Sequence, residues 1–292
     1  ISRGELVEIG GEFRIPEVMT LSGARLVEVG TTNRTHMADY ERAIGPDTAA
    51  ILKVHPSNYR VVGFTSSVTG GELARLARGR GVCFFHDVGS GLIDAPDEAS
   101  WVGSEPDVKT CLREGADLVT FSGDKLFGGP QAGIIVGRPD LIEKLERHPL
   151  LRALRIDKMG LAALDATVSA YLNGARDIPV WEFASVPAVE LERRARHLSD
   201  VLTEEHVKAE AVPTRAVIGG GSVPGSELPS WAVAVTPDDG TADDLHAALR
   251  HGDPPVIGRI EDERVLLDLR AIAEPEDGAL RAAVVTAVRP SG

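Results

Sequence analysis

Cysteine is scarce in this sequence, with only two among 292 residues, Cys83 and Cys111. No CxxC or Cys/His spacing surrounds them, so the pattern predicts neither a metal site nor a disulfide framework and favours a reducing compartment. Apolar runs are also short. None approaches the roughly 18 residues that a membrane-spanning helix requires, and no signal peptide opens the chain. We therefore expect a cytoplasmic protein with no metal and no membrane contact.

Positive charge is the second shortage. The chain carries 31 Lys and Arg against 44 Asp and Glu, a net charge of −13. Residues 181–292 hold 11 basic and 20 acidic residues, a net charge of −9. An acidic surface repels phosphates, which argues against a large nucleic-acid interface, above all in the carboxy-terminal part. A polynucleotide would have to be bound by local basic clusters in the first part, by a partner subunit, or by sequence outside these residues.

The order of apolar and helical patterns predicts an α/β fold. With 43% hydrophobic residues the chain can bury a full core. In the first 180 residues, strand-like runs alternate with helical patterns, which is typical of a mostly parallel, doubly wound sheet with helices on both faces. The expected strands are 6–9, 25–29, 50–54, 82–87, 116–121 and 133–136, and the expected helices are 15–21, 37–44, 71–78 and 108–114. The last two strands are joined by a turn too short for a crossover, so the sheet should be mixed.

A smaller α/β domain should follow this sheet. Long helical patterns cover 141–154, 158–171 and 186–205. Beyond them we expect strands at 232–236, 256–260 and 265–269, with helices at 242–251 and 277–288. We place the domain boundary at Ile178-Pro179, which gives a catalytic domain over 1–178 and a small domain over 179–292. A continuous helix is expected to bridge the two.

The most informative motif is T-F-S-G-D-K-L-F-G-G-P-Q-A-G, residues 120–133. Lys125 closes an apolar strand and precedes a glycine-rich turn, which puts it at the carboxyl edge of the sheet, where α/β folds bind ligands. A lysine amine can form a Schiff base with pyridoxal phosphate (PLP), and the small residues of the turn would let backbone approach a flat ring or a phosphate. A solvated lysine beside a turn is the alternative, and the motif alone leaves both open.

A carboxylate upstream favours the cofactor hypothesis. The strand V-C-F-F-H-D-V-G-S-G, residues 82–91, ends in His86-Asp87, and Asp87 precedes Lys125 by 38 residues, enough for one crossover to the same rim. PLP requires a carboxylate at its ring nitrogen, because a protonated ring is the better electron sink. A turn cap is the alternative for Asp87. A histidine in the position of His86 is more often a hydrogen-bonded structural group than a catalyst.

Several long segments resemble one family. They are S-R-G-E-L-V-E-I-G-G, F-R-I-P, L-V-E-V-G-T-T-N-R-T-H, K-V-H-P-S-N-Y, S-G-D-K-L-F-G-G-P-Q-A-G and P-P-V-I-G-R-I-E-D-E-R-V-L-L-D-L-R-A-I. Together they resemble bacterial selenocysteine synthase, L-seryl-tRNA(Sec) selenium transferase, over essentially the whole chain. The resemblance implies a fold-type-I PLP enzyme that converts L-seryl-tRNA(Sec) to L-selenocysteinyl-tRNA(Sec) with selenophosphate, through an aminoacrylate intermediate. It also implies a homo-oligomer, a ring of dimers with shared active sites.

The resemblance adds roles for residues around Lys125. Asp124, beside the lysine, would be an acid or base during loss of the serine hydroxyl; a turn carboxylate is the alternative. From its own position, Ser122 could donate to the cofactor phosphate, and it suits a turn equally well. Ser90 lies in a loop-like stretch, so a cofactor contact is the lesser alternative there. Asn58, after a strand, could reach the ring oxygen, and the pattern leaves this role open.

Arg152 and Arg155 follow in L-L-R-A-L-R-I-D-K. Their i,i+3 spacing would put two guanidiniums on one helix face, which suits a tetrahedral oxyanion, although a solvated face is the commoner explanation. The resemblance assigns this motif to the selenium donor. The run I-G-G-G-S-V-P-G-S, residues 218–226, lacks the ending of a Walker motif, and we expect a flexible loop there, with approach to an active site as the lesser alternative.

The family also implies elements ahead of Ile1. They are a tRNA-binding domain, a phosphate-binding loop and a residue that stacks on the cofactor ring, and no substitute for that loop occurs downstream. We therefore expect this chain alone to hold PLP weakly and not to bind tRNA. Two rival functions stay open: a PLP-dependent lyase or transferase for a free amino acid, and an inactive oligomerising remnant of the fold.

Overall fold

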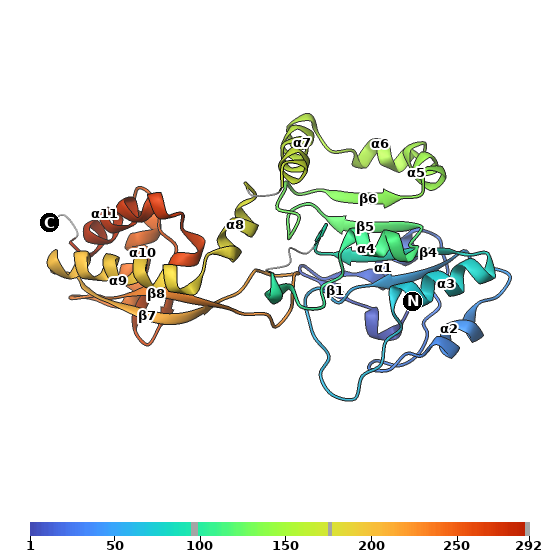
Figure 1. Cartoon of the computed structure of the whole chain (residues 1–292), viewed down its shortest axis with the longest axis horizontal. Helices are drawn as coiled ribbons and strands as arrows, with labels where there is room; N and C mark the ends of the chain where they lie inside the picture. The colour runs from blue at the N-terminus through green and yellow to red at the C-terminus, as the bar shows by residue number, and fades with distance from the viewer. Residues whose placement is uncertain (95–98, 175–176, 290–292) are drawn as a thin grey trace. The chain divides into compact units, whose positions relative to one another are not determined.

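The computed structural model describes residues 1–94, 99–174 and 177–289 (Figure 1). The chain divides into two units, of which the first comprises Ile1–Ile178 together with Gly219–Ser226. The second comprises Pro179–Ile218 and the residues from Glu227 onward. The return of Gly219–Ser226 to the first unit differs from the expected domain ranges. No helix in the described ranges is long and apolar enough to cross a membrane.

The first unit is built on a four-stranded sheet. Its strands, in the spatial order β3-β4-β5-β6, are β3 (Ala50–Val54), β4 (Cys83–Gly89), β5 (Leu118–Ser122) and β6 (Gly133–Gly137). The first three run parallel, and β6 is antiparallel to β5, with Ser122 opposite Gly133. The predicted mixed sheet is therefore confirmed, and its strands lie within two residues of the predicted ranges.

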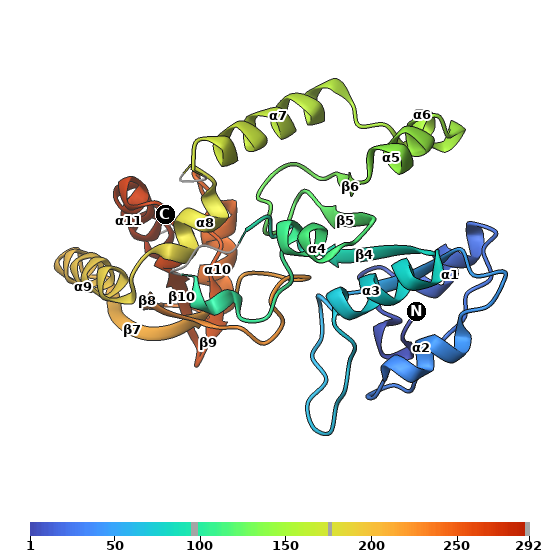
Figure 2. The ribbon, with the colours of Figure 1, turned by 45° about the vertical axis from the view of Figure 1, so that its right-hand side comes forward.

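Helices cover both faces of this sheet. They are α1 (Ile15–Leu21), α2 (Met37–Ala43), α3 (Gly70–Arg80) and α4 (Val108–Glu114), of which α3 and α4 lie side by side in Figures 1 and 2. Phe84 of β4 packs with Leu73 of α3 in one core cluster. On the opposite face, Val54 of β3 packs with Ile15 of α1 in another. Since neighbouring residues of a strand point to opposite faces, the alternation along β3 and β4 fixes which residues meet which helices.

Local signals explain where the helices begin. Thr69 accepts a hydrogen bond from the Glu72 amide, and the Glu72 carboxylate accepts from the Thr69 amide, which is a capping box at the start of α3. Asp107 accepts from the Thr110 amide at 2.7 Å and caps α4. The polypeptide before the sheet forms a short helical turn, η1 (Arg3–Glu5). It then forms an antiparallel pair of two-residue strands, β1 (Glu8–Ile9) and β2 (Phe13–Arg14).

Several predictions in this unit were wrong. Residues 25–29 form no strand, and only Val29 makes an isolated bridge, to Ser2. The expected helix 141–154 is two helices, α5 (Pro139–Glu146) and α6 (Pro149–Leu154). A proline disfavours the helical conformation of the residue before it, and His148, which precedes Pro149, is extended. The third helix, α7 (Lys158–Leu172), ends before Gly174, whose φ is 99°. All three lie beyond β6 in both views.

The second unit has an antiparallel sheet in the order β7-β8-β10-β9. Its strands are β7 (Lys208–Ala216), β8 (Leu228–Thr236), β9 (Arg259–Glu261) and β10 (Arg264–Asp268). Its helices are α8 (Pro179–Ser185), α9 (Ala188–Glu204), α10 (Ala242–His251) and α11 (Asp277–Val288), with short turns η3 (Leu269–Ala271) and η4 (Glu274–Glu276). The expected continuous helix between the domains was wrong, because α7 ends at Leu172 in the first unit and α8 begins at Pro179, a residue type that starts helices but does not continue them. The sequence also missed β7, an edge strand that contains Pro213.

An ion pair with a buried arginine joins α9 to α11 in this unit. The Arg194 side chain in α9 is 4% exposed and donates to both carboxylate oxygens of Asp277, at 2.6 and 3.0 Å. It also donates to the Ile272 carbonyl at 3.0 Å. Because Asp277 opens α11, this guanidinium fixes the start of α11 against α9.

Replacing Arg194 with Ala should lower the free energy of unfolding of the second unit by about 3–5 kcal/mol, because a partly buried carboxylate loses its partner. Urea unfolding followed by the fluorescence of Trp181 and Trp231 measures the change. The adjacent Arg193, whose pairs with Glu190 and Glu274 are exposed, is the matched control. Its Ala variant should change stability far less. Equal losses in the two variants would contradict the role given to Arg194.

Candidate active site

Lys125 lies in the turn that follows β5. Three backbone hydrogen bonds shape this turn: Gly123 N to Ala132 O at 2.8 Å, Gly129 N to Gly123 O at 2.7 Å, and Gly128 N to Lys125 O at 2.9 Å. The next two residues, Leu126 and Phe127, are 0% and 4% exposed. The turn is thus anchored in the core on one side while Lys125 itself stays half-buried.

Two glycines approach the amine of Lys125. A Cβ atom built on Gly89, at the end of β4, would lie 4.0 Å from Lys125 Nζ. A Cβ atom built on Gly221 would lie only 2.9 Å from Nζ and 3.0 Å from Cε. Both glycines have positive φ, 69° and 78°. The amine therefore lies between the end of β4 and the loop formed by residues 219–226, where backbone rather than side chain faces it.

Asp87 of β4 lies at the same carboxyl edge of the sheet as Lys125, which is called the rim below. It pairs with Thr120 of β5, and Thr120 Oγ1 donates to Asp87 Oδ1 at 2.9 Å. Burial raises the pKa of the Asp87 carboxyl, while hydrogen bonds from Thr120 and the Gly89 backbone, and the charges of Lys125 and His55, oppose the rise. A cationic group beside Asp87 would offset the cost of burying its negative charge.

His86 points to the other face of β4. Burial, with smaller effects of the Lys53 and His55 charges, lowers the pKa of His86 to about 3. Neither ring nitrogen has a hydrogen-bond partner among the described residues. His86 is therefore a neutral core residue, and the alternative that made it a hydrogen-bonded group was wrong in that detail.

The four remaining candidates for cofactor contact or acid/base catalysis differ from one another in burial and in hydrogen bonding. Ser90 is 0% exposed, and its Oγ has no partner in the described part of the chain. Ser122 ends β5 and is half-buried. Asn58 is exposed, and its amide donates to the Glu8 carbonyl at 2.7 Å. Asp124 is exposed beside Lys125.

Arg152 and Arg155 are both exposed. Arg152 lies in α6, but Arg155 is the residue after the helix, with an extended ψ of 138°. The predicted common helix face was therefore wrong, because α6 ends at Leu154. The two side chains remain three residues apart on one exposed segment.

Sequence reasoning missed Thr120 and Glu105. Thr120 is a polar residue inside the apolar run A-D-L-V-T-F-S, and that signal was available. Glu105 gave no signal, because its partners are distant in sequence: His55 Nε2 at 3.1 Å and the Val223 amide at 3.3 Å, both to Oε2. For the loop of residues 219–226, the sequence makes approach to an active site only the lesser alternative, whereas in the structure Gly221 lies against Lys125.

The rim residues fit PLP. They supply a primary amine, the half-buried carboxylate of Asp87, and the buried hydroxyl of Ser90, which has no hydrogen-bond partner among the described residues. No group of three His, Cys, Asp or Glu side chains within the described ranges has the arrangement of a metal site.

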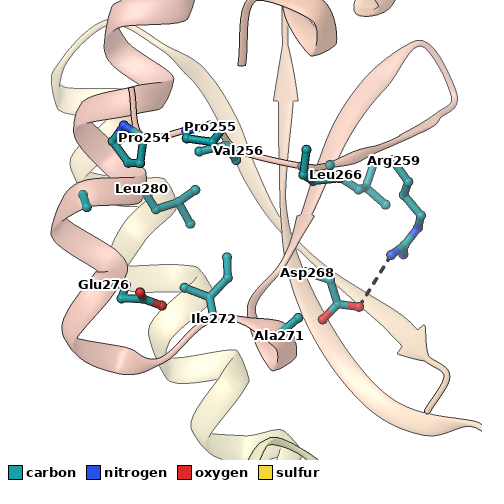
Figure 3. Close-up of a pocket in the computed structure, with 13 residues that line it drawn as sticks. Pro254, Pro255, Val256, Arg259, Leu266, Asp268, Ala271, Ile272, Glu276 and Leu280 are labelled. Atoms are coloured by element: carbon teal, nitrogen blue, oxygen red, sulfur yellow. Dashed lines mark ion pairs between the residues drawn. The ribbon is translucent and has the colours of Figure 1, made fainter. Parts of the chain in front are cut away.

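A separate cavity of about 500 Å³ lies in the second unit. In Figure 3, Leu280 and Ile272 point into it, and Arg259 and Asp268 form an ion pair of 3.5 Å at one end. None of the predicted site residues lines this cavity.

Comparison with known proteins decides the family. The family described as "SelA: L-seryl-tRNA selenium transferase" matches residues 1–273. The chain belongs to this family. It is 53% identical over 295 aligned positions to the L-seryl-tRNA(Sec) selenium transferase of Moorella thermoacetica, covering 99% of this chain and 62% of that protein. The enzyme of the same name from Hyphomonas neptunium is 48% identical, covering 94% of this chain and 60% of that protein.

The chain thus spans about three fifths of the length of these relatives. Among solved structures, D-glucosaminate-6-phosphate ammonia-lyase superposes with a TM-score of 0.62 at 24% identity, covering 98% of this chain and 69% of that one. At this identity the likeness shows the fold alone. It agrees with the predicted fold-type-I class.

The raised pKa of Asp87 makes a prediction about stability and pH. The unfolded carboxyl titrates near 3.8, and the pKa of the folded one is higher. The folded state therefore loses stability as the pH rises from the unfolded pKa through the folded pKa, and the whole loss remains at higher pH. An Asp87→Asn variant stays neutral. It should therefore be more stable than the parent at pH 7, and the difference should vanish as the pH falls below the unfolded pKa.

Denaturant unfolding between pH 3 and pH 8 measures this difference. Asp47→Asn, at an exposed carboxylate, is the control and should show no such trend. A destabilised Asp87→Asn variant at pH 7 would contradict the assignment of a destabilising buried charge.

Proposed function

We propose that this chain carries the catalytic centre of an L-seryl-tRNA(Sec) selenium transferase, which converts L-seryl-tRNA(Sec) to L-selenocysteinyl-tRNA(Sec). The observation that carries the proposal is the placement of the Lys125 amine and the Asp87 carboxylate at the ends of two adjacent parallel strands. Membership of the family, whose relatives bear this name, supports the substrate and the reaction.

The rim residues are suited to hold PLP. Lys125 would bind its aldehyde carbon, Asp87 would face its ring nitrogen, and Ser90 would offer its hydroxyl, which has no partner in the described part of the chain. When bound, PLP supplies an electron sink for negative charge that develops at the Cα atom of the seryl group.

The chain's own groups then handle the protons. Lys125, once its amine is free, removes the proton from the seryl Cα, because it lies within the half-buried rim where that atom would be held. Asp87 stays ionised when a cation faces it, and the Thr120 hydroxyl fixes the carboxylate that makes this contact. Asp124, exposed beside Lys125, would relay the proton that Lys125 has taken to the leaving serine hydroxyl, so that water leaves and the lysine amine is neutral again.

Selenium would arrive as selenophosphate. Arg152 and Arg155 offer two exposed guanidiniums three residues apart, whose forks of donors match the oxygens of a tetrahedral anion. The acidic charge of residues 181–292 supports tRNA contacts elsewhere than on the second unit. We further propose a cytoplasmic homo-oligomer, with Ser122 and Asn58 as additional cofactor contacts.

The first test of this proposal is chemical trapping. PLP followed by borohydride should attach a stable pyridoxyl group to Lys125, because reduction converts an imine to a secondary amine. Peptide mass spectrometry identifies the labelled lysine, and Lys125→Ala should lose the label and, in the complete protein, all turnover of seryl-tRNA. Lys53 serves as the internal control and should stay unlabelled, because its Nζ forms an ion pair with Glu5 Oε1 at 2.7 Å. Labelling of Lys53 in preference to Lys125 would overturn the assignment.

The second test separates the donor step. The Arg152→Ala and Arg155→Ala variants should slow selenium transfer by at least about 10-fold, as expected for loss of a charge-assisted contact, while the pyridoxyl label on Lys125 persists. Arg147→Ala, at an exposed arginine that pairs with Glu143, is the control. Equal loss of labelling and transfer would indicate a structural role for the two arginines.

A further inference from the structure

The loop of residues 219–226 lies against the reactive end of Lys125. Gly221 is so close that any side chain there would meet the lysine Nζ and Cε atoms, at 2.9 and 3.0 Å from its Cβ. Ser222 and Val223 are 6% and 8% exposed, so the loop is packed into the first unit. It therefore covers the amine with backbone.

Two hydrogen bonds anchor this loop. Ser226 Oγ donates to the Trp101 carbonyl at 2.7 Å. The Val223 amide donates to Glu105 Oε2 at 3.3 Å. Since a hydrogen bond to a carboxylate is stronger than one between neutral groups, Glu105 is the more important anchor.

Glu105 is itself fixed from the sheet. Its side chain is 2% exposed, and the same Oε2 accepts from His55 Nε2 at 3.1 Å. A carboxylate only accepts hydrogen bonds, so the imidazole is the donor. His55 follows β3, and its amide donates to the Asp87 carbonyl at 2.8 Å. The carboxylate thus joins the loop to the strand end that carries Asp87.

The loop is held in a strained conformation. Val223 has a φ of 46°, in the left-handed region that a β-branched residue rarely occupies. Such a conformation persists only where surrounding contacts impose it. The other Glu105 oxygen, Oε1, is buried without a hydrogen-bond partner in the described part of the chain. Retention of a strained valine and a buried, half-satisfied carboxylate at one contact indicates a role beyond packing.

We propose that Glu105 is a positioning residue for Lys125: its carboxylate holds the 219–226 loop closed over the lysine amine. The closed loop restricts the amine to the side that faces Asp87 and limits access of water to it. The inference rests on the proposed function only in taking Lys125 as the reactive amine.

The test uses the 292-residue chain without cofactor or tRNA. In Glu105→Gln, backbone amides of residues 219–226 should exchange hydrogen on the order of 10-fold faster, because the charged anchor is lost and the strain at Val223 is released. Trinitrobenzenesulfonate should also modify Lys125 faster relative to the exposed Lys109. Amides of β4 and β5 should exchange at the parental rate. Mass spectrometry of peptides measures all three.

Glu227→Gln is the matched control, because it removes an exposed carboxylate next to the loop that pairs with Arg215 at 3.5 Å. It should leave exchange in the loop and the reactivity of Lys125 unchanged. Ser226→Ala removes the second anchor. It should accelerate the same amides by a smaller factor, and it serves as the test if Glu105→Gln does not fold.

Unchanged exchange in 219–226 in both variants would overturn the proposal, as would equal acceleration in the loop and in β4 and β5. Neither result bears on selenium transfer, since no substrate is present. Conversely, failure of the pyridoxyl label at Lys125 would reject the proposed function and leave the anchoring of the loop by Glu105 intact.

Discussion

The parallel pairing of β4 with β5 is the constraint on which the candidate site depends. Its register sets Asp87 beside Thr120, and the turn after β5 carries Lys125. Side chains alternate between faces along a strand, so a slip of one residue would move Asp87 to the face of α3 and α4 and bring His86 to the rim. The apolar residues Phe84 and Val88 prevent such a slip, because both are nearly inaccessible in the core on that face. Packing on one face of the sheet thus determines the chemistry available on the other.

The site has a cost in stability that the rest of the first unit offsets. Asp87 is a half-buried carboxylate with a raised pKa, Ser90 and Glu105 each have a buried oxygen without a partner among the described residues, and Val223 has a strained φ. Each feature disfavours the folded state on its own. Val223 and Glu105 meet in the loop whose Gly221 lies against Lys125, and Asp87 lies near the end of the neighbouring strand β4. The core between the sheet and its helices is otherwise apolar, except for His86, whose ring nitrogens have no partner among the described residues. Such clustering is typical of sites that bind a ligand, because the ligand supplies the missing partners.

Sequence patterns predicted the parts of this arrangement that depend on local chemistry. The four strands of the first sheet were recognisable from apolar runs, the lysine and the aspartate from their positions at strand ends, and helices such as α3 from their helical patterns. The breaks were harder to predict: residues 141–154 retain a helical pattern although Pro149 interrupts it. Contacts across long separations could not be predicted at all. Glu105 meets His55 fifty residues away and Val223 more than a hundred away, and no periodicity relates them.

The distribution of charge around the rim links the two carboxylates. His55 donates to Glu105 through its ring, and its charge also lowers the pKa of Asp87. The His55 imidazole therefore interacts with both the Glu105 and the Asp87 carboxylates. The charge of Lys125 also opposes the rise in the pKa of Asp87. A group that neutralises or replaces the lysine charge would thus change the environment of Asp87, and through His55 that of Glu105 and the loop it holds. The anchor of the loop and the protonation of the rim are consequently parts of one electrostatic network.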